Sequence, residues 1–437
     1  MKPLNIAIAG LGTVGGGTLR LLQDQAEQIE KKAGRPIKVA AVSSLNILHN
    51  TKLKLAGIDR VENALELAKR PDVDVVCELI GGTEGVAKDL CEATLRNGKS
   101  LVTANKALLA YHGLELARLA EENKVAMMFE ASVGGGIPVI KAVREFLASN
   151  KVLSIEGIMN GTCNYILTRM ANENMDFEPV LAEAQELGYA EADPSADVDG
   201  ADSAHKLAVL TGLAFGVKPD MKAIDLEGLR RVTKSDIEFA RELGYKIKLL
   251  AAARMTDKGL EQRVSPCFVP KNSTLGSTDG VLNGFKVKGS HAGYLTFIGA
   301  GAGGDATATA VVSDIMDLAR MDLTTGVGLK PWGRPVAQLG TAQPLARKDS
   351  VGKWYIRLQL TDAAGVLADI TTIMGEEGVS IESLLQKGKL QNGSVPVVIM
   401  THETNSETIA AVMQKISRLK TVWDPPFFLR VEEGLDL

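Results

Sequence analysis

The stretch NIAIAGLGTVGGG, residues 5–17, decides the expected fold of this chain. A short apolar run over residues 4–9 is long enough for a buried parallel strand, and Gly10, Gly12 and Gly15 follow it in G-x-G-x-x-G spacing. In this motif the first glycine permits a tight turn, the second lets the backbone approach a pyrophosphate, and the third lets helix and strand pack closely. We therefore expect a dinucleotide at the N-terminus of the helix that follows.

The segments after these glycines continue the pattern of a doubly wound fold. Residues 14–32 have the apolar spacing of a helix, and IKVAAV, residues 37–42, is a second expected strand. Strands and helices then alternate to about residue 130, which is typical of a parallel Rossmann sheet of the α/β class. The dinucleotide-binding residues expected here are Gly10, Gly12, Thr13, Val14 and Gly15.

Two further domains are expected beyond the Rossmann domain, which we assign to residues 1–130 plus about 305–330. Residues 131–304 mix strands and helices without the earlier rhythm, and we expect a second domain of the α+β class there. Prolines and glycine make residues 331–350 a candidate linker. Residues 351–437 show the order βαββαβ, which predicts a separate ferredoxin-like domain.

The composition argues against several classes of protein. The net charge is −4 and there is no long block of like charge, so a nucleic-acid-binding surface is not expected. No apolar run approaches the roughly 18 residues of a membrane helix. The start of the chain lacks the pattern of a secretory signal, and its cysteines are scattered, as reduced thiols are. We therefore expect a cytoplasmic protein without a membrane partner.

The end of the second expected strand leaves the choice of dinucleotide open. An acidic residue there would bind the ribose 2′-hydroxyl of NAD, but the chain has Ser43 and Ser44. No arginine stands beside them to bind a 2′-phosphate, and Lys52 and Lys54 downstream are explained either as 2′-phosphate ligands or as a solvated face. The sequence leans toward NADP and leaves NAD open.

The segment GYAEADPSADVDGADSAHK, residues 188–206, gathers several carboxylates and one lysine. Its proline and Asx residues predict a loop, with a helix beginning near Asp199 or Gly200. Asp202 and Lys206 then share one face of that helix. The pattern fits an N-capped helix with a surface ion pair. It also fits a polar pocket in which a carboxylate binds a substrate ammonium and the lysine donates a proton to a carbonyl.

Three further positions have a functional and a structural explanation. Lys106, in TANKALLA, follows a parallel strand at the end where ligands bind, but it also suits the start of a helix. The glycine-rich turn in EASVGGGIP can present carbonyl oxygens to a cation, with Glu130 adding charge, or serve as a hinge. Cys163 could be a nucleophile, yet no histidine stands near it in sequence, and a buried structural cysteine is favoured.

Together these segments resemble the homoserine dehydrogenase family. The matching stretches run in family order over about residues 1–325 and are GLGTVGGG, ELIGG, TANKALLA, FEASVGGGIP, IMNGTCNYIL, LGYAEADPSADVDGADSAHKLAVL and GAGAGGDATATAVVSDI. The later stretch DAAGVLADI resembles the start of an ACT domain, a small amino-acid-sensing module. The resemblance implies reversible NAD(P)H-dependent reduction of L-aspartate 4-semialdehyde to L-homoserine, in the biosynthesis of threonine, methionine and isoleucine.

The resemblance also implies that residues 131–304 form a catalytic and dimerisation domain, and it implies roles for individual residues. Lys206 and Asp202 match the acid–base pair, with Lys206 as proton donor, and Lys106 matches the lysine between cofactor and substrate. Glu191 matches the ligand of the substrate amino group, and Asp197 lines the polar pocket. The other implied ligands are Glu130, Val133, Gly135 and Ile137 for Na⁺ or K⁺, the last three through main-chain carbonyls; Gly301 and Gly303 near the nicotinamide; and Asp362, Gly365 and Gln386 for an effector, expected to be threonine.

Other interpretations stay open at this point. The chain could be an amino-acid-sensing binding protein with a vestigial Rossmann domain, or an aldehyde dehydrogenase that uses Cys163. The three effector-site residues could form an ordinary strand–helix turn. Exposed sheet edges favour a homodimer or homotetramer. The chain departs from the family at Ala306, where proline is common, and at the second strand, which lacks the basic residue often used for NADP.

Overall fold

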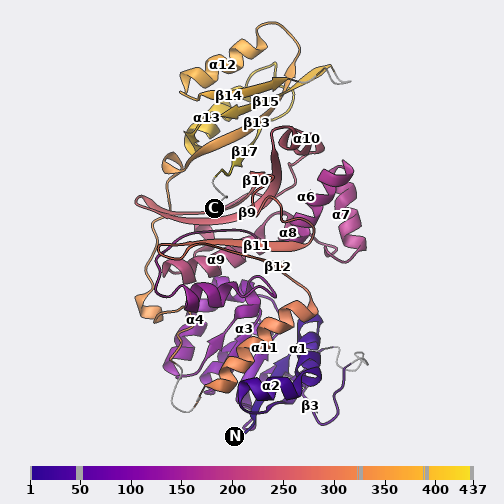
Figure 1. Ribbon diagram of the computed structural model, residues 1–437, viewed down its shortest axis with the longest axis vertical. Helices are drawn as coiled ribbons and strands as arrows, with labels where there is room; N and C mark the ends of the chain where they lie inside the picture. Colours follow the sequence, from indigo (N-terminus) through magenta and orange to yellow (C-terminus); the bar gives the residue numbers. More distant parts are fainter. Residues whose placement is uncertain are drawn as a thin grey trace. The chain divides into compact units, whose positions relative to one another are not determined.

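The computed structural model describes residues 2–45, 53–321, 323, 328–386, 388 and 393–433, and Figure 1 shows their helices and strands. The chain divides into two compact units. Unit 1 comprises residues 1–161, 202–224 and 281–342, and unit 2 comprises residues 162–201, 225–280 and 343–437.

Unit 1 contains a parallel sheet with the strand order β3-β2-β1-β4-β5-β6. The strand order reverses beside β1, which is where doubly wound sheets bind dinucleotides. The predicted Rossmann fold is therefore confirmed. The strands are β1 (Leu4–Ala9), β2 (Ile37–Ser43), β3 (Asp59–Arg60), β4 (Val75–Glu78), β5 (Ser100–Thr103) and β6 (Met127–Met128).

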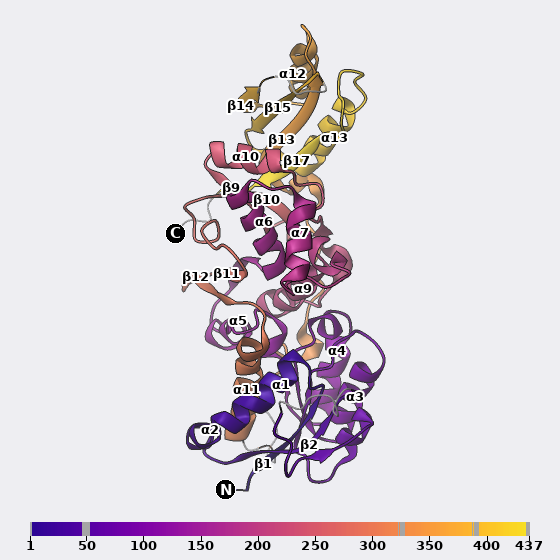
Figure 2. The ribbon, with the colours of Figure 1, turned by 90° about the vertical axis from the view of Figure 1, so that its right-hand side faces the viewer.

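Alternate residues of β1 contribute to two apolar cores, one on each face of the sheet. Ile6 and Ile8 pack in one core with residues of α1 and α11, whereas Ala7 and Ala9 pack in the other with Leu90 of α3. Figures 1 and 2 show α11 beside α1, although the two helices are far apart in the sequence. The helices of this unit are α1 (Thr13–Asp24), α2 (Ala26–Ala33), α3 (Val86–Arg96), α4 (Lys106–Glu122), α5 (Val139–Lys141), α9 (Ala201–Phe215) and α11 (Gly304–Arg320).

The expected single helix over residues 14–32 is wrong in one respect, because it is two helices. α1 ends at Asp24 and α2 begins at Ala26, with Gln25 between them outside helical geometry (φ −112°, ψ 18°). α2 then ends at Ala33, and its C-cap is Gly34, whose φ of 80° suits a glycine. Apolar periodicity alone does not show such a break, since both helices bury residues in the same core.

Unit 1 also holds three antiparallel strands in the order β12-β11-β7. These are β7 (Val152–Ile158), β11 (Leu282–Gly289) and β12 (Gly293–Ala300). Part of the expected linker packs into this unit: Trp332 is fully buried and its indole N–H donates to the Gly113 carbonyl at 3.3 Å. A Cβ on Gly113 or Gly212 would come within 2.9 or 2.7 Å of the indole ring, so these glycines make room for it.

Unit 2 contains the C-terminal domain in the predicted order βαββαβ. Its elements are β13 (Val351–Thr361), α12 (Val366–Glu376), β14 (Ile381–Gln386), β15 (Ser394–Thr401), α13 (Ser406–Ile416) and β17 (Phe427–Val431). Both helices pack on one face of the sheet, where Ile370 and Ile409 share a core with Ile356; Figure 2 shows this layer.

The C-terminal sheet continues into a long hairpin of β9 (Tyr245–Thr256) and β10 (Gly259–Pro270). β17 pairs with β10 in parallel, with Cys267 opposite Arg430. The remaining elements of unit 2 are α6 (Gly161–Glu173), α7 (Phe177–Glu186), α8 (Ser195–Val198), α10 (Lys234–Glu242), β8 (Asp225–Leu226) and β16 (Thr404–Asn405).

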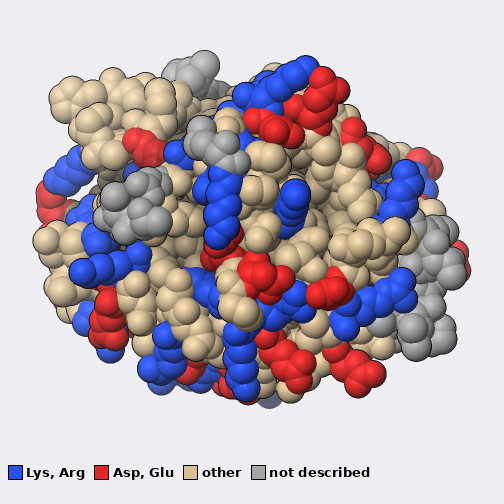
Figure 3. Space-filling model, turned by 90° about the horizontal axis from the view of Figure 1, so that it is seen from below, with Lys and Arg blue, Asp and Glu red and all other residues tan. Residues whose placement is uncertain are grey.

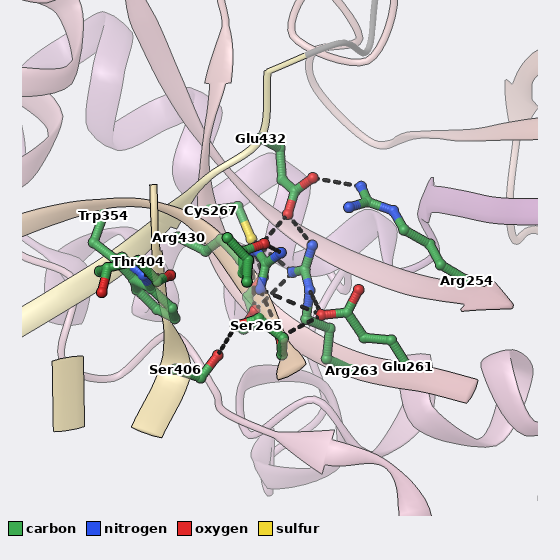
Figure 4. A network of polar contacts seen from close by, with 12 residues as sticks. Arg254, Glu261, Arg263, Ser265, Cys267, Trp354, Thr404, Ser406, Arg430 and Glu432 are labelled. Atoms are coloured by element: carbon green, nitrogen blue, oxygen red, sulfur yellow. Dashed lines mark hydrogen bonds and ion pairs between the residues drawn. The ribbon is translucent and has the colours of Figure 1, made fainter. Parts of the chain in front are cut away.

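A buried charge network, drawn in Figure 4, fixes β17 to β10. The carboxylate of Glu432 accepts hydrogen bonds from Arg263 and, at 2.5 Å, from Arg254. Arg430 lies 3.3 Å from Glu261 and 3.1 Å from Glu432. Four of these five side chains are almost completely buried, so the last strand of the chain is bound to the hairpin by ion pairs that are shielded from water.

No helix among the described residues is long and apolar enough to cross a membrane. On the face drawn in Figure 3, basic and acidic side chains are interspersed. That face therefore presents no field of a single sign.

Candidate active site

The glycine loop after β1 has the geometry that the motif predicts. Gly10 has a φ of 91°, and a Cβ there would lie 2.5 Å from the Leu79 carbonyl oxygen. A Cβ on Gly15 would lie 1.8 Å from the Gly10 oxygen, whereas one on Gly12 would have nothing within 4 Å. The fold itself therefore requires Gly10 and Gly15, and Gly12 leaves open space at the start of α1 for a ligand.

An open cavity of ≈ 480 Å³ lies at this end of α1. It is lined by Leu11, Gly12, Thr13, Gly16, Arg20, Gly304 and Asp305. The start of α11 forms part of this wall through Gly304 and Asp305. The two helices pack closely, because a Cβ on Gly17 of α1 would come within 2.7 Å of the Gly304 oxygen. The loop with Gly301 and Gly303 leads directly into α11, and Gly303 is its N-cap. Two helix N-termini thus border one cavity, which favours an anion such as a pyrophosphate.

One cation of this cavity was missed by the sequence analysis. Arg20 lies one helical turn after Gly16 and forms an ion pair with Asp305 at 3.4 Å. The available signal was its place in the helix that follows the glycine motif. At the end of β2, Ser43 is buried and its hydroxyl donates to the Glu62 carbonyl at 3.3 Å. Lys52, considered above for a 2′-phosphate, lies outside the described residues.

Asp202, Lys206 and Lys106 meet in unit 1. The Lys206 Nζ lies 2.7 Å from the Asp202 Oδ2, and the Lys106 Nζ lies 3.1 Å from the Oδ1. Asn160 donates to the same carboxylate at 2.8 Å, and Lys206 also donates to the Met159 carbonyl at 2.7 Å. Asp202 and Lys206 are each 8% exposed. The interpretation as a surface ion pair is therefore wrong.

Electrostatics keeps Asp202 ionised in this place. Burial opposes its charge, but Lys206, Lys106 and the hydrogen bonds from Lys206 and Asn160 hold its pKa well below the ordinary value. Two of the three Lys206 N–H groups are used by Asp202 and Met159, which leaves one without a partner among the described residues. The neighbouring His205 packs edge-on against Tyr111, and burial lowers its pKa.

Two residues that the sequence analysis missed position Lys106. Asn105 caps α4 by accepting from the Leu108 N–H at 3.0 Å, so Lys106 is the first helical residue. Glu78 is fully buried at the end of β4, and its carboxylate accepts from the Thr103 hydroxyl at 2.7 Å and from the Ile80 N–H at 2.8 Å. An acidic residue that ends an apolar strand was the available signal for Glu78.

Glu191 and Asp197 lie in unit 2. The Glu191 side chain is exposed, and Asp197 belongs to the one-turn helix α8. The prediction of a plain loop is thus wrong for residues 195–198, and α9 begins at Ala201 rather than at Asp199 or Gly200. Cys163 is fully buried and its thiol donates to the Asp197 carbonyl at 3.2 Å, which supports a structural role.

The glycine-rich turn after β6 begins with a buried carboxylate. Glu130 accepts from the backbone N–H groups of Ile140 at 3.0 Å and Lys141 at 2.8 Å. Burial and the nearby Asp314 raise its pKa to about 8. Among the described residues, no group of three or more His, Cys, Asp or Glu side chains could hold a metal. Any cation in this turn would therefore need main-chain carbonyl oxygens in addition to Glu130.

The candidate effector residues lie in the C-terminal domain. Asp362 is exposed in the turn after β13, and Gly365, with a φ of 91°, is the N-cap of α12. Gln386 is the exposed last residue of β14 and pairs with Val397 of β15.

Three sequence models of known families match the chain. Residues 10–130 match the homoserine dehydrogenase NAD-binding domain, residues 138–316 match homoserine dehydrogenase, and residues 354–421 match the ACT domain. Homoserine dehydrogenases of Neisseria gonorrhoeae and Pseudomonas aeruginosa are 43% and 40% identical to this chain, over 99% of it and 99% and 100% of their own lengths.

Solved structures agree with these relatives. A homoserine dehydrogenase from Thiobacillus denitrificans matches with a TM-score of 0.93 and 39% identity, over 99% of both chains. A hyperthermophilic archaeal homoserine dehydrogenase in complex with NADPH matches with a TM-score of 0.62 and 25% identity, over 72% of this chain and 97% of its own. The chain has a Rossmann cavity and a buried lysine–carboxylate centre, and it matches homoserine dehydrogenases over its full length. It therefore belongs to the homoserine dehydrogenase family.

Proposed function

We propose that this NAD(P)-dependent homoserine dehydrogenase reduces L-aspartate 4-semialdehyde to L-homoserine with Lys206 as the proton donor. The observation that carries the proposal is the buried Asp202 held between the Nζ atoms of Lys206 and Lys106. Such a centre can supply positive charge and a proton to an oxygen that becomes negative. The exposed carboxylate of Glu191 is the proposed ligand of the substrate ammonium, and Asp197 the proposed lining of the polar pocket.

The proposed chemistry divides between the cofactor and this chain. A reduced nicotinamide supplies a hydride for the aldehyde carbon. Lys206 directs its remaining N–H at the carbonyl oxygen, stabilises the developing alkoxide and transfers a proton to it. Asp202 stays ionised and fixes the Lys206 ammonium, while Lys106 adds a second positive charge 3.1 Å from the carboxylate. In the oxidation direction Lys206 accepts the proton from the alcohol.

We also propose that the dinucleotide is NADP and that the two glycine loops and Lys106 bind it. The NAD-binding family match supports a nicotinamide cofactor, and the absence of a carboxylate at Ser43 and Ser44 favours NADP. Gly10, Gly12, Thr13, Val14 and Gly15 would hold the pyrophosphate. Lys106, Gly301 and Gly303 would lie at the nicotinamide end.

Steady-state kinetics with the two cofactors tests the NADP preference. We expect kcat/KM for NADPH to exceed that for NADH at least tenfold. The variant Ser44→Asp should lower the NADPH value by charge repulsion and leave the NADH value unchanged or higher. Gln25→Asp, a new carboxylate between α1 and α2, is the matched control and should alter neither value. Equal use of both cofactors by the wild type would contradict the proposal.

The same kinetic assay also tests whether a monovalent cation raises the activity. We propose that Glu130, Val133, Gly135 and Ile137 hold Na⁺ or K⁺, through the carbonyls of the last three. This is supported by the Val133 and Gly135 carbonyls, which accept no hydrogen bond from the described residues, whereas the Ile137 carbonyl accepts one from the Val139 N–H at 2.8 Å. The Glu130 carboxylate is already bound to the N–H groups of α5. Activity should rise in NaCl or KCl relative to tetramethylammonium chloride of equal ionic strength.

We propose threonine feedback through the ACT domain at Asp362, Gly365 and Gln386. The exposed turn and the glycine cap of α12 support this assignment. A truncation that removes residues 351–437 would also destabilise the rest of the chain. It would leave Arg263 and Glu261 buried without their partners Glu432 and Arg430.

Point variants give the sharper test of threonine feedback. Asp362→Ala should raise the threonine concentration for half-inhibition at least tenfold and leave the uninhibited rate unchanged, because it removes a charge from the proposed effector turn. Glu376→Ala, an exposed acidic residue at the far end of α12, should behave as wild type. A threonine-insensitive wild type, or equal inhibition of both variants, would refute the assignment.

We also propose a division of the chain into domains and an oligomeric state. We assign the Rossmann domain to residues 1–130 plus about 305–330, the catalytic domain to 131–304, the linker to 331–350 and the ACT domain to 351–437. A homodimer or homotetramer is favoured by β14, which ends its sheet in unit 2 and has alternate exposed residues.

A further inference from the structure

Unit 2 contains a second cavity, of ≈ 140 Å³, away from the residues assigned above. It lies among α6, α10, the start of β9 and the segment after β10. Its apolar wall includes Leu167 and Ile237, and its basic residues are Arg241, Lys246, Lys248 and Lys271. We propose that this cavity binds a small molecule that carries a carboxylate on a short aliphatic chain.

The excess of positive charge around the cavity favours an anionic ligand. Four basic side chains line it, and Asp279 is its one acidic lining residue. Asp279 is occupied by Lys246 at 2.6 Å and by Lys248 at 2.9 Å. Arg241 and Lys271 form no ion pair or side-chain hydrogen bond with any described residue. A guanidinium and an ammonium beside one cavity can together bind both oxygens of a carboxylate.

The inner end of the cavity is rigid. Lys248 is 1% exposed, and its Nζ donates to the Asn164 Oδ1 at 2.8 Å, the Thr278 carbonyl at 2.6 Å and Asp279 at 2.9 Å. These three bonds use all of its donors. Burial lowers the Lys248 pKa to about 8, against the effect of Asp279. Lys248 thus holds the cavity in shape and leaves ligand recognition to Arg241 and Lys271.

The size of the cavity limits the ligand. A volume of ≈ 140 Å³ is close to that of a cavity of about 150 Å³ that takes up benzene in another protein. The ligand therefore has about six to eight non-hydrogen atoms. A carboxylate facing Arg241 and Lys271, with a short aliphatic chain against Leu167 and Ile237, fits this volume. Branched organic acids and small aliphatic amino acids share this chemistry.

The cavity shares helix α10 with a contact to the ACT sheet. Asp236 is fully buried and accepts from the Tyr355 hydroxyl at 2.8 Å and from the Arg357 Nε at 2.7 Å, both on β13. The next residue, Ile237, lines the cavity. A ligand that draws Arg241 inward would therefore act on a helix whose first turn is fixed to the ACT domain.

Saturation-transfer NMR and calorimetric titration of the full chain, without nucleotide or substrate, test this proposal. The probes are isobutyrate, 2-oxobutyrate, L-valine and L-threonine. We expect at least one probe to bind, and Arg241→Ala/Lys271→Ala to raise its Kd at least tenfold. Lys348→Ala, which removes an exposed lysine outside the cavity, should bind as wild type does. Circular dichroism melting checks that the variants are folded.

Each outcome decides the matter. If an organic acid binds and the double variant weakens it, the ligand belongs to the organic acids; if an amino acid alone does so, it belongs to the amino acids. The proposal is overturned if no probe binds, or if the double variant binds every probe as tightly as wild type. The latter result would place binding elsewhere, such as at Asp362. Dehydrogenase turnover is measured separately and does not depend on this outcome.

Discussion

Replacing Lys206 by alanine is expected to lower kcat about 10²–10⁴-fold, the usual contribution of a positioned proton donor, while NADPH still binds. The variant loses the N–H that is proposed to bind the substrate oxygen and also leaves Asp202 with Lys106 and Asn160 as partners. Stopped-flow or steady-state assays with L-aspartate 4-semialdehyde measure kcat, and fluorescence titration measures NADPH binding.

The matched control for this experiment is Lys218→Ala, which removes an exposed lysine shortly after α9. We expect it to keep the wild-type kcat. Asp202→Asn should also lower kcat, because the amide no longer fixes the two ammonium groups. Full activity of the Lys206 variant would remove this residue from the mechanism and leave Lys106 as the basic group of the centre.

The pH dependence of activity near neutral pH should not come from Asp202. Since the pKa of Asp202 lies well below its ordinary value, this carboxylate stays ionised throughout the neutral and mildly acidic range. Its contribution to stability is present above the unfolded value of about 3.9 and is lost only as the pH falls below it. A loss of kcat/KM between pH 5 and 7 would thus come from another group.

Local patterns in the sequence predicted the parts of the fold and site that depend on short spacings. The glycine motif predicted the turn at Gly10 and the packing at Gly15, and the four-residue step predicted that Asp202 and Lys206 share a face. The burial of that pair could not be predicted in this way. It depends on Asn160 and the Met159 carbonyl, which reach α9 from a distant segment.

Long-range contacts explain what the sequence analysis missed. Arg20 and Asp305 are 285 positions apart, and no local period connects them. Glu432 stands near the end of the chain in a charged stretch, where an exposed side chain is the usual expectation. Its burial follows from the parallel pairing of β17 with β10, a contact that only the folded chain reveals.

Of the substitutions proposed for this protein, Glu432→Ala should cause the largest loss of stability, about 3–5 kcal/mol in the free energy of unfolding. The alanine would leave the buried Arg263 with only the more distant Glu261 carboxylate, at 3.9 Å, among these residues, and Arg430 would lose one of its two carboxylates (Figure 4). Denaturant unfolding followed by tryptophan fluorescence reports the change, because Trp354 packs in the core of the C-terminal domain.

Glu433→Ala is the control for this measurement, since it changes the adjacent residue to the same side chain. Glu433 is half exposed and pairs with Lys353 at 3.0 Å, so its removal should cost less than about 1 kcal/mol. Equal destabilisation by the two variants would show that the buried network contributes no more than a surface pair.

Acid titration gives an independent readout of the same network. Burial opposes the charge of Glu432, but Arg263, Arg254 and Arg430 lower its pKa to about 2. A lowered folded-state pKa stabilises the protein above the unfolded value of about 4.3, and this stability is lost as the pH falls from there toward 2. The wild type should therefore lose stability in that range, and Glu432→Gln, with no carboxyl group to protonate, should lose less. A parallel decline of both proteins would mean that other carboxylates control the acid unfolding of unit 2.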